Sequence, residues 1–404
     1  MMWEKVKIGD IYEGLYDGPH ATPPTSDDGA IFLGISNITK DGHIDLSDIK
    51  HINENDLPKW TKRVTPKGGD IVFSYEATLN LYAIIPDDFW GCLGRRMALI
   101  RPDETKAHGK YLYYYFFSEE WRSTVSSHII TGATVDRIPI AKFPEFIISL
   151  PPMEKQHKIA NILSNYDDLI VNNKKQIKLL EEAAQRLYKE WFVDLHFPGY
   201  EDVEIVAGVP EGWKKERAEC FFKITIGKTP PRAEKQWFVN GNNGISWLSI
   251  SDMRDAGAFI FKTREGLTEE AIKKHNMKIV PSGTIFVSFK LTVGRVAIAT
   301  TEMCTNEAIA HFYVNDSLQA YTYCYLSNFE YDTLGNTSSI SKAVNSKIIK
   351  AMPFIMPSQD IVEKFSAIVS PILSEIKAKQ EMCNYLSEAR DRLLPKLMSG
   401  EIEV

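Results

Sequence analysis

Residues 69–84 read GDIVFSYEATLNLYAI, and residues 283–298 read GTIFVSFKLTVGRVAI. Aligned without gaps, the two segments share Gly, Ile, Ser, Thr, Ala and Ile at the same places. Each begins with a glycine and continues as an apolar run that ends in Ser and an aromatic residue, which is typical of a strand and the turn after it. A match at a shift of 214 positions predicts that one globular unit is built twice in this chain.

Further matches flank these segments. Residues 32–37 (FLGISN) correspond to residues 247–252 (WLSISD), and residues 22–24 (TPP) correspond to residues 229–231 (TPP). Short β-branched and aromatic runs bounded by Gly, Pro, Asp and Asn predict strands and turns in each copy, with helices such as 108–122. Each copy is therefore expected to be an α+β unit.

A long helical pattern follows each copy. Residues 153–197 contain no Gly or Pro, which allows one helix of about 40 residues. Apolar residues recur every seven positions there and again 206 residues later, which predicts two helices that pair as a coiled coil. Two amphipathic helices packed only on their own domains are the competing interpretation. Pro371 should kink or start the second helix, because proline removes a helical hydrogen bond.

Polar residues interrupt the heptads. Asn173 and Lys379 are equivalent at the shift of 206, and a polar residue at a buried heptad position commonly sets the register at some cost in stability. We therefore expect Asn173 and Lys379 to help align the two helices. Arg390 is a further break in the second pattern.

Composition and charge restrict the class of protein. The chain has 404 residues, of which 44% are apolar, so two globular domains are expected. The net charge is −6, and residues 1–152 hold 16 basic and 21 acidic side chains, so this segment is not a basic DNA-binding arm. No run of about 18 apolar residues and no secretory signal occur, which predicts a cytoplasmic protein without a membrane segment. Five cysteines without C-x-x-C spacing favour reduced thiols.

Several motifs occur in an order that resembles the specificity subunits of type I restriction-modification systems. Residues 17–23 (DGPHATP) and 227–230 (GKTP) each resemble the start of a target recognition domain. Residues 150–156 (LPPMEKQ) resemble the entry to the first conserved helix of that family, and residues 393–400 (LLPKLMSG) resemble the end of the second. Residues 356–359 (MPSQ) depart from the entry motif, which leaves the start of the second helix open.

The resemblance implies two similar α/β target recognition domains and two long conserved helices that form an antiparallel coiled coil, with a pseudo-two-fold internal repeat. The expected segments are residues 1–152 for the first recognition domain, 153–198 for the central helix, 199–357 for a linker and the second recognition domain, and 358–404 for the C-terminal helix.

The resemblance also implies a non-catalytic subunit that recognises a bipartite, asymmetric target in double-stranded DNA. Its partners would be two methyltransferase subunits that modify adenine, and restriction subunits that translocate DNA can join them. No cofactor is then expected in this chain, while S-adenosylmethionine and ATP belong to the partner subunits. The sequence agrees, because it contains no Asn-Pro-Pro-Tyr, Gly-x-Gly-x-x-Gly or His-Glu-x-x-His motif and suggests no metal site.

Reading of DNA bases requires donors and acceptors that loops display into a groove. Polar residues gather in loops at duplicated places, although turn capping and solvated surface charge are the competing interpretations for each residue alone. Glu76 and Lys290 are equivalent but carry opposite charges, so the two copies should read different bases. The candidates are Gly18, His20, Thr22, Ser74, Tyr75, Glu76, Gly132, Thr134 and Arg137 in the first copy, and Lys228, Thr229, Ser288, Lys290, Arg295, Ser339 and Lys342 in the second.

Two other classes of function remain open at this point. An enzyme with an unrecognised site would need one convergent set of reactive side chains, whereas this chain repeats its polar loops twice. A coiled-coil scaffold that binds only proteins would not need two diverged globular domains. DNA recognition within a methyltransferase complex is therefore the preferred hypothesis.

Overall fold

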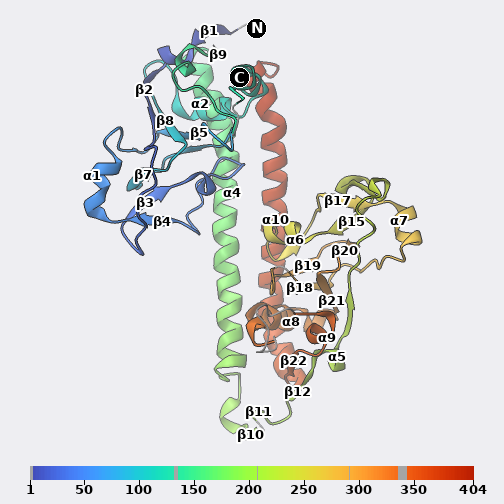
Figure 1. The fold of residues 1–404 in the computed structure, drawn as a ribbon. Coiled ribbons are helices and arrows are strands. Elements are labelled where there is room, and N and C mark those ends of the chain that lie inside the picture. Colours follow the sequence, from blue (N-terminus) through green and yellow to red (C-terminus); the bar gives the residue numbers. More distant parts are fainter. Residues whose placement is uncertain (1–2, 132–134, 207, 291, 335–343) are drawn as a thin grey trace. The chain divides into compact units, whose positions relative to one another are not determined.

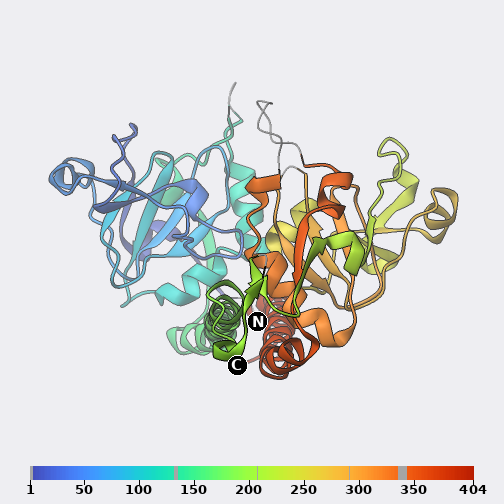
Figure 2. The same ribbon diagram turned by 90° about the horizontal axis from the view of Figure 1, so that it is seen from below.

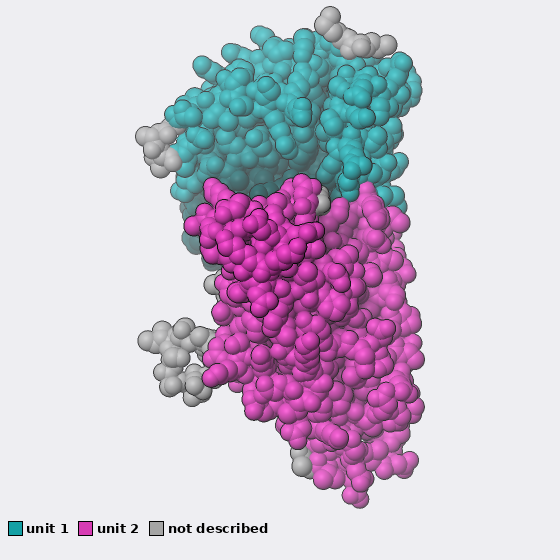
Figure 3. Space-filling model, turned by 90° about the vertical axis from the view of Figure 1, so that its right-hand side faces the viewer, with its two compact units in different colours: residues 1–169, 386–404 teal, residues 170–385 magenta. Residues whose placement is uncertain are grey.

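The computed structural model describes residues 3–131, 135–206, 208–290, 292–334 and 344–404. The chain divides into two compact units, one formed by residues 1–169 with 386–404 and the other by residues 170–385 (Figure 3). Each unit therefore combines one copy of the repeat with a segment of each long helix.

The first unit contains the strands β1 (Glu4–Lys7), β2 (Tyr12–Asp17), β3 (Ala30–Leu33), β4 (Lys50–Ile52), β5 (Ile71–Ser74), β6 (Tyr82–Ile84), β7 (Gly91–Leu93), β8 (Met97–Pro102) and β9 (Ile147–Leu150) (Figure 1). An antiparallel sheet has the order β2-β8-β5-β6, and a smaller mixed sheet has the order β4-β3-β7. β1 and β9 form a separate antiparallel ladder in which Glu4 pairs with Leu150.

The second unit contains the strands β10 (Ile205–Val206), β11 (Val209–Pro210), β12 (Lys214–Arg217), β13 (Lys223–Ile226), β14 (Phe238–Asn240), β15 (Ile245–Leu248), β16 (Phe259–Ile260), β17 (Glu265–Leu267), β18 (Ile285–Ser288), β19 (Val296–Ala299), β20 (Cys304–Thr305), β21 (Ile309–Tyr313) and β22 (Pro353–Met356). Its sheets have the orders β13-β21-β18-β19-β16 and β14-β17-β15-β20. β12 and β22 form a ladder in which Lys214 pairs with Met356.

The two units repeat one topology. The order β2-β8-β5-β6 in the first unit corresponds to β13-β21-β18-β19 in the second, and β4-β3-β7 corresponds to β17-β15-β20. The pairing also agrees, because β3 and β7 are parallel, as are β15 and β20. The predicted α+β fold and its internal repeat are confirmed, and the second unit adds β14 and β16 at sheet edges.

The shorter helices are α1 (Leu57–Trp60), α2 (Gly109–Tyr115) and α3 (Glu119–His128) in the first unit and α5 (Ala218–Phe221), α6 (Ile250–Asp255), α7 (Glu269–Lys274), α8 (Asp316–Asn328) and α9 (Ser346–Lys350) in the second. The prediction of one helix at 108–122 is wrong, because α2 and α3 replace it. The Ser118 hydroxyl accepts a hydrogen bond from the backbone N–H of Trp121 and thereby caps the new helix.

The two long helices are α4 (Met153–Tyr188), which continues into a π-helix at Lys189–Val193, and α10 (Gln359–Ser399). In the first unit the start of α4 packs with the end of α10, and in the second unit the end of α4 packs with the start of α10. This is the antiparallel pairing that the family resemblance implies. Figure 2 looks along these helices, and the sheets of each unit lie beside its helical segments.

Several predicted heptad residues form the buried seam of the helix pair. The buried ones are Ile159, Leu163, Ile170, Ala184 and Trp191 on the first helical segment and Val362, Phe365, Val369, Ile376 and Leu397 on the second. Pro371 lies inside α10 and does not start it, so of the two expected effects only a kink stays a prediction. No helix in the described part of the chain is long and apolar enough to cross a membrane.

A buried ion pair joins α4 to α10 within the first unit. Arg390 Nη1 lies 2.5 Å from Asp167 Oδ1, and each side chain is only 12% exposed. The hydroxyl of Tyr114, on α2, donates to the other carboxylate oxygen of Asp167 at 2.5 Å. The break predicted at Arg390 is thus a specific contact between the helices. The repeat places Leu373 and Ala184, both buried, at the equivalent positions of the second unit.

The other two polar heptad residues behave differently. Lys379 Nζ lies 3.0 Å from Glu375 Oε1 on the same helix, and Asn173 is half-buried. Lys379 therefore has a partner without crossing to α4. A role of Asn173 and Lys379 in helix register stays a prediction.

Candidate nucleic-acid interface

The loops predicted to read DNA in the first unit meet at the β7–β8 turn, residues 94–96. The backbone N–H of Gly18, after β2, donates to the Met97 carbonyl at 2.7 Å. The N–H of Tyr75, after β5, donates to the Arg96 carbonyl at 3.1 Å. These bonds hold three loops from distant parts of the sequence at one end of the sheet.

A fourth segment joins this cluster. The N–H of Ile138 donates to the Tyr75 carbonyl at 2.8 Å, and the N–H of Ala77 donates to the Asp136 carbonyl at 3.1 Å. Arg137 forms an antiparallel bridge with Glu76 and is exposed. The candidate segment that ends at Arg137 therefore lies beside the loop after β5.

We call the backbone hydrogen bonds that hold these loops to the turn the loop frame. The second unit repeats this frame around the β20–β21 turn, residues 306–308. The N–H of Gly227 donates to the Ile309 carbonyl at 3.1 Å, and the N–H of Phe289 donates to the Ala308 carbonyl at 2.9 Å. Gly227 and Phe289 thus stand where Gly18 and Tyr75 stand in the first unit. These two backbone bonds are therefore duplicated, although the side chains around them differ.

Charged groups surround Tyr75 in the first unit. Glu76 Oε1 lies 3.1 Å from Arg96 Nε, and Asp17 Oδ1 lies 2.5 Å from Arg63 Nη1. Burial, followed by the charges of Asp17 and Glu76, raises the pKa of Tyr75. Its hydroxyl therefore stays protonated at neutral pH and can donate a hydrogen bond.

A basic pocket of about 370 Å³ opens beside this cluster. His20 Nε2 lies 3.1 Å from Asp17 Oδ2 and 3.3 Å from Arg63 Nη1, so the histidine is held by a charged pair. Lys59 and Lys62 also line the pocket. Such a group of cations is suited to binding a DNA phosphate. Phosphate contacts of this kind fix the position and orientation of a protein on the duplex.

In the second unit, Glu307 lies on the turn and accepts a hydrogen bond from the Thr229 hydroxyl. Partial burial raises the pKa of Glu307, but the bond from Thr229 and the positive charges of Lys290 and Arg232 outweigh it, so the pKa lies below its ordinary value. The carboxylate is therefore charged at neutral pH. Lys228 Nζ donates to the His275 carbonyl at 2.6 Å, and this bond orients the loop.

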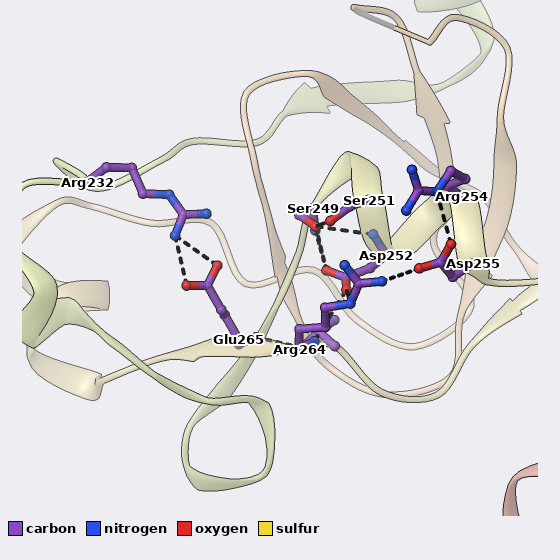
Figure 4. Close-up of polar contacts among 9 residues, drawn as sticks. Arg232, Ser249, Ser251, Asp252, Arg254, Asp255, Arg264 and Glu265 are labelled. Atoms are coloured by element: carbon purple, nitrogen blue, oxygen red, sulfur yellow. Dashed lines mark hydrogen bonds and ion pairs between the residues drawn. The ribbon is translucent and has the colours of Figure 1, made fainter. Parts of the chain in front are cut away.

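Arg232 extends this cluster and is held by a carboxylate and two aromatic rings, and Figure 4 shows its pair with Glu265. Its Nη1 lies 2.9 and 2.8 Å from the two carboxylate oxygens of Glu265. Its guanidinium carbon lies 4.2 Å from the ring centre of Phe238 and 4.5 Å from that of Trp247. An arginine fixed in this way loses little conformational entropy when it binds a ligand.

Figure 4 also shows a charged network at α6. Asp252 accepts hydrogen bonds from the N–H and hydroxyl of Ser249, at 3.0 and 2.7 Å, and so completes the cap of this helix. Asp255 pairs with Arg264 and, at 3.0 Å, with Arg254. The two arginines are largely exposed, so the network offers cations to solvent in the same unit.

A buried histidine on β21 contacts the strand residue that precedes the β20–β21 turn. His311 on β21 is fully buried, with Nδ1 2.8 Å from Thr225 Oγ1 and Nε2 2.7 Å from Thr305 Oγ1. The Thr305 hydroxyl donates to the Asn306 carbonyl, so Nε2 donates to Thr305 and Nδ1 accepts from Thr225. Burial, followed by the charge of Lys278, lowers the pKa of His311 to about 3, and the ring is neutral.

A family model described as the type I restriction modification DNA specificity domain matches residues 2–182 and 210–382. The chain belongs to this family. It is a DNA-binding specificity subunit, the non-catalytic component of a type I restriction-modification system, and the enzyme and pure-scaffold hypotheses are thereby set aside.

Relatives of this specificity subunit span most of its length. The type I restriction enzyme MjaIX specificity subunit of Methanocaldococcus jannaschii is 29% identical, over 88% of this chain and 82% of the relative. The HindI specificity subunit of Haemophilus influenzae is 24% identical over 99% of both chains. The crystal structure of the type I S subunit from M. genitalium shares the fold, with a TM-score of 0.58, 17% identity and coverage of 98% of this chain and 96% of the other.

The predicted site residues of the specificity subunit differ in their exposure to solvent. His20, Thr22, Arg137, Lys228 and Lys290 are exposed on the loops. Glu76 and Thr229 are half-buried, whereas Gly18 and Tyr75 are buried, and Gly18 contributes its backbone N–H to the frame. Gly132, Thr134, Ser339 and Lys342 lie outside the described residues.

Two predicted residues are buried in the protein, and a third lies away from the loop cluster. Ser74 and Ser288 are fully buried, and the Ser288 hydroxyl donates to the Thr292 carbonyl at 2.6 Å and accepts from the Arg295 N–H at 3.0 Å. The expectation that these two serines face DNA is therefore wrong in the structure described, because their hydroxyls shape turns. The Arg295 side chain lines a pocket with Glu181 of α4, apart from the cluster around Glu307.

Sequence reasoning missed several charged residues of the specificity subunit. Arg95 and Arg96 in the first unit and Glu307 in the second lie on the turns at which the loops meet. The adjacent pair Arg95-Arg96, between two apolar runs, was a usable signal. No signal in the sequence pointed to Arg63 or Arg232, because only the fold brings these two residues close to the loops. No group of three or more His, Cys, Asp or Glu residues suited to a metal occurs in the described part of the chain.

Proposed function

We propose that each unit reads one half of a split, asymmetric DNA target, and that the chain docks methyltransferase subunits, with or without restriction subunits, for adenine methylation or cleavage. S-adenosylmethionine and ATP would be bound by those partners. The observation that carries the proposal is the duplicated loop frame, which presents different charges in each unit. Identical frames with different side chains are suited to two different base sequences.

The chemistry of each cluster is suited to both tasks of a DNA reader. In the first unit, Lys59, Lys62 and Arg63 offer cations for phosphates, while the exposed Arg95 offers donors for base edges. In the second unit, Arg232 and Lys290 offer donors and Glu307 an acceptor. Phosphate contacts position the protein, and base contacts then discriminate sequences.

The half-site assignment is tested by exchanging one unit. Residues 1–152 are replaced by the equivalent segment of a relative whose methylation target has been mapped, and the chain is expressed with its own methyltransferase subunits. We expect sequencing of methylated sites to show one half of the target changed and the other retained. Exchange of residues 199–357 should change the complementary half. A change in both halves after either exchange contradicts independent reading.

The partner requirement gives a second expected result. Residues 1–152 hold more acidic than basic side chains, so the chain alone attracts phosphates weakly. We expect the isolated chain to bind a target duplex at least ~10-fold more weakly than the complex at about 150 mM salt, because partner cations enclose the DNA. Fluorescence anisotropy with and without methyltransferase subunits measures this. Equal, site-specific affinity of the isolated chain would contradict it.

A further inference from the structure

The duplicated frame defines which residues of the two turns are equivalent. The N–H of Gly94 donates to the carbonyl of Leu33 at 2.7 Å, and the N–H of Asn306 donates to that of Leu248 at 3.0 Å. The carbonyl of Arg96 accepts a hydrogen bond from the loop after β5, and the carbonyl of Ala308 accepts one from the loop after β18. The residue between these anchors is Arg95 in the first unit and Glu307 in the second.

The turn and the loop beside it have exchanged charges between the units. In the first unit the turn carries Arg95 and Arg96, and the loop carries Glu76. In the second unit the turn carries Glu307, and the loop carries Lys290 at the place of Glu76. The same backbone surface therefore presents a donor where its counterpart presents an acceptor.

Arg95 is available to bind a ligand, whereas Arg96 is not. Arg96 is held by Glu76 at 3.1 Å. Arg95 is exposed, and its side chain forms no ion pair or hydrogen bond with any residue that the structure describes. Glu307 is also exposed, and the Thr229 hydroxyl that donates to it leaves the remaining acceptor sites of the carboxylate open.

We infer that Arg95 and Glu307 determine base specificity, one in each unit. Arg95 donates to the O6 and N7 acceptors of a guanine, and Glu307 accepts from an exocyclic amino group of cytosine or adenine in the major groove. Glu307 also disfavours guanine and thymine at its position, because their major-groove acceptors face a negative charge. This inference rests on the proposed function and assigns the residues that carry it.

The alternative role for an exposed arginine is a phosphate contact. A phosphate contact carries no sequence information, so its loss weakens binding to every site equally. Arg95→Gln separates the two roles, because a glutamine side chain pairs with adenine rather than guanine. Glu307→Gln removes the charge but keeps an acceptor for the Thr229 hydroxyl. Arg95 has no described partner and Glu307→Gln is nearly isosteric, so both variants should fold, which thermal unfolding verifies.

The experiment uses the full chain with its methyltransferase subunits and sequences the methylated sites. We expect Arg95→Gln to reduce the preference for guanine at one position of one half-site by about 5- to 150-fold and to raise methylation at adenine there. Glu307→Gln should relax one position of the other half-site. Lys67→Ala and Glu302→Gln are matched controls, because these exposed residues lie at the opposite ends of the same sheets, and they should leave the target unchanged.

Other outcomes would contradict specific parts of the inference. A uniform loss of methylation in Arg95→Gln, or no change, contradicts base reading by Arg95. It leaves the proposed function standing as long as the wild-type target is split. An unchanged target in Glu307→Gln does the same for Glu307. Changes by both variants within one half-site overturn the assignment of one unit to each half, and thereby the proposed function itself.

Discussion

Replacing Asp167 with Ala is expected to lower the free energy of unfolding of the first unit by about 3 kcal/mol or more. The substitution leaves the Arg390 guanidinium, only 12% exposed, without its buried partner, and leaves the Tyr114 hydroxyl without an acceptor. Asp391 remains 2.8 Å from Arg390 but is 65% exposed, so it compensates little. Hydrogen exchange of amides in the first unit measures the change, because two units can unfold separately.

The repeat supplies the matched rescue. The double variant Asp167→Leu, Arg390→Ala copies Leu373 and Ala184 from the second unit, and we expect it to recover most of the lost stability, since an apolar pair often replaces a buried ion pair without cost. Arg392→Ala is the control within the first unit. It removes an exposed pair with Glu388 on the same helix, which contributes only about 0.5 kcal/mol. A double variant as unstable as Asp167→Ala would show that the helix pair requires the ion pair at this place.

Acid is expected to destabilise the second unit through His311. The folded state holds this ring neutral with a pKa of about 3, whereas the unfolded chain protonates near its ordinary value of 6.5. The unfolded state therefore binds more protons between these values, and stability falls as the pH falls, by about 1.4 kcal/mol per pH unit at most. The contribution is complete above pH 6.5 and is lost as the pH approaches 3.

The test compares the wild type with His311→Leu, which copies Leu99 from the equivalent position of the first unit. Hydrogen exchange of the second unit at several pH values gives the slope of stability against pH. We expect the variant to have a shallower slope below pH 6.5 and a lower stability at pH 8, because Thr225 and Thr305 lose their partner. Equal slopes would mean that His311 takes up a proton as readily in the folded protein as in the unfolded chain.

The fold was largely predictable because its signals are periodic. The repeat at 69–84 and 283–298 and the seven-residue pattern of apolar residues are visible without any knowledge of tertiary contacts. The errors are local. The helix predicted at 108–122 breaks at Ser118, whose capping bond competes with helix continuation, and Pro371 is accommodated inside α10.

The candidate site was less predictable because it depends on which loops meet. The segments around Gly18, Tyr75 and Lys228 were found, since they belong to duplicated motifs. Ser74 and Ser288 were chosen as exposed donors, but a serine at the end of a buried strand satisfies its own turn. Arg95 and Glu307 differ in charge, so sequence matching between the copies did not align them.

The two-stranded ladders, β1 with β9 and β12 with β22, have a consequence at the level of the gene. Because Glu4 lies opposite Leu150, and Lys214 opposite Met356, the chain enters and leaves each globular domain at neighbouring points. The two chain connections of such a domain therefore lie next to each other. If each domain reads one half of the target, as proposed above, recombination between genes within these short ladders would exchange one half-site and leave the supporting helices intact.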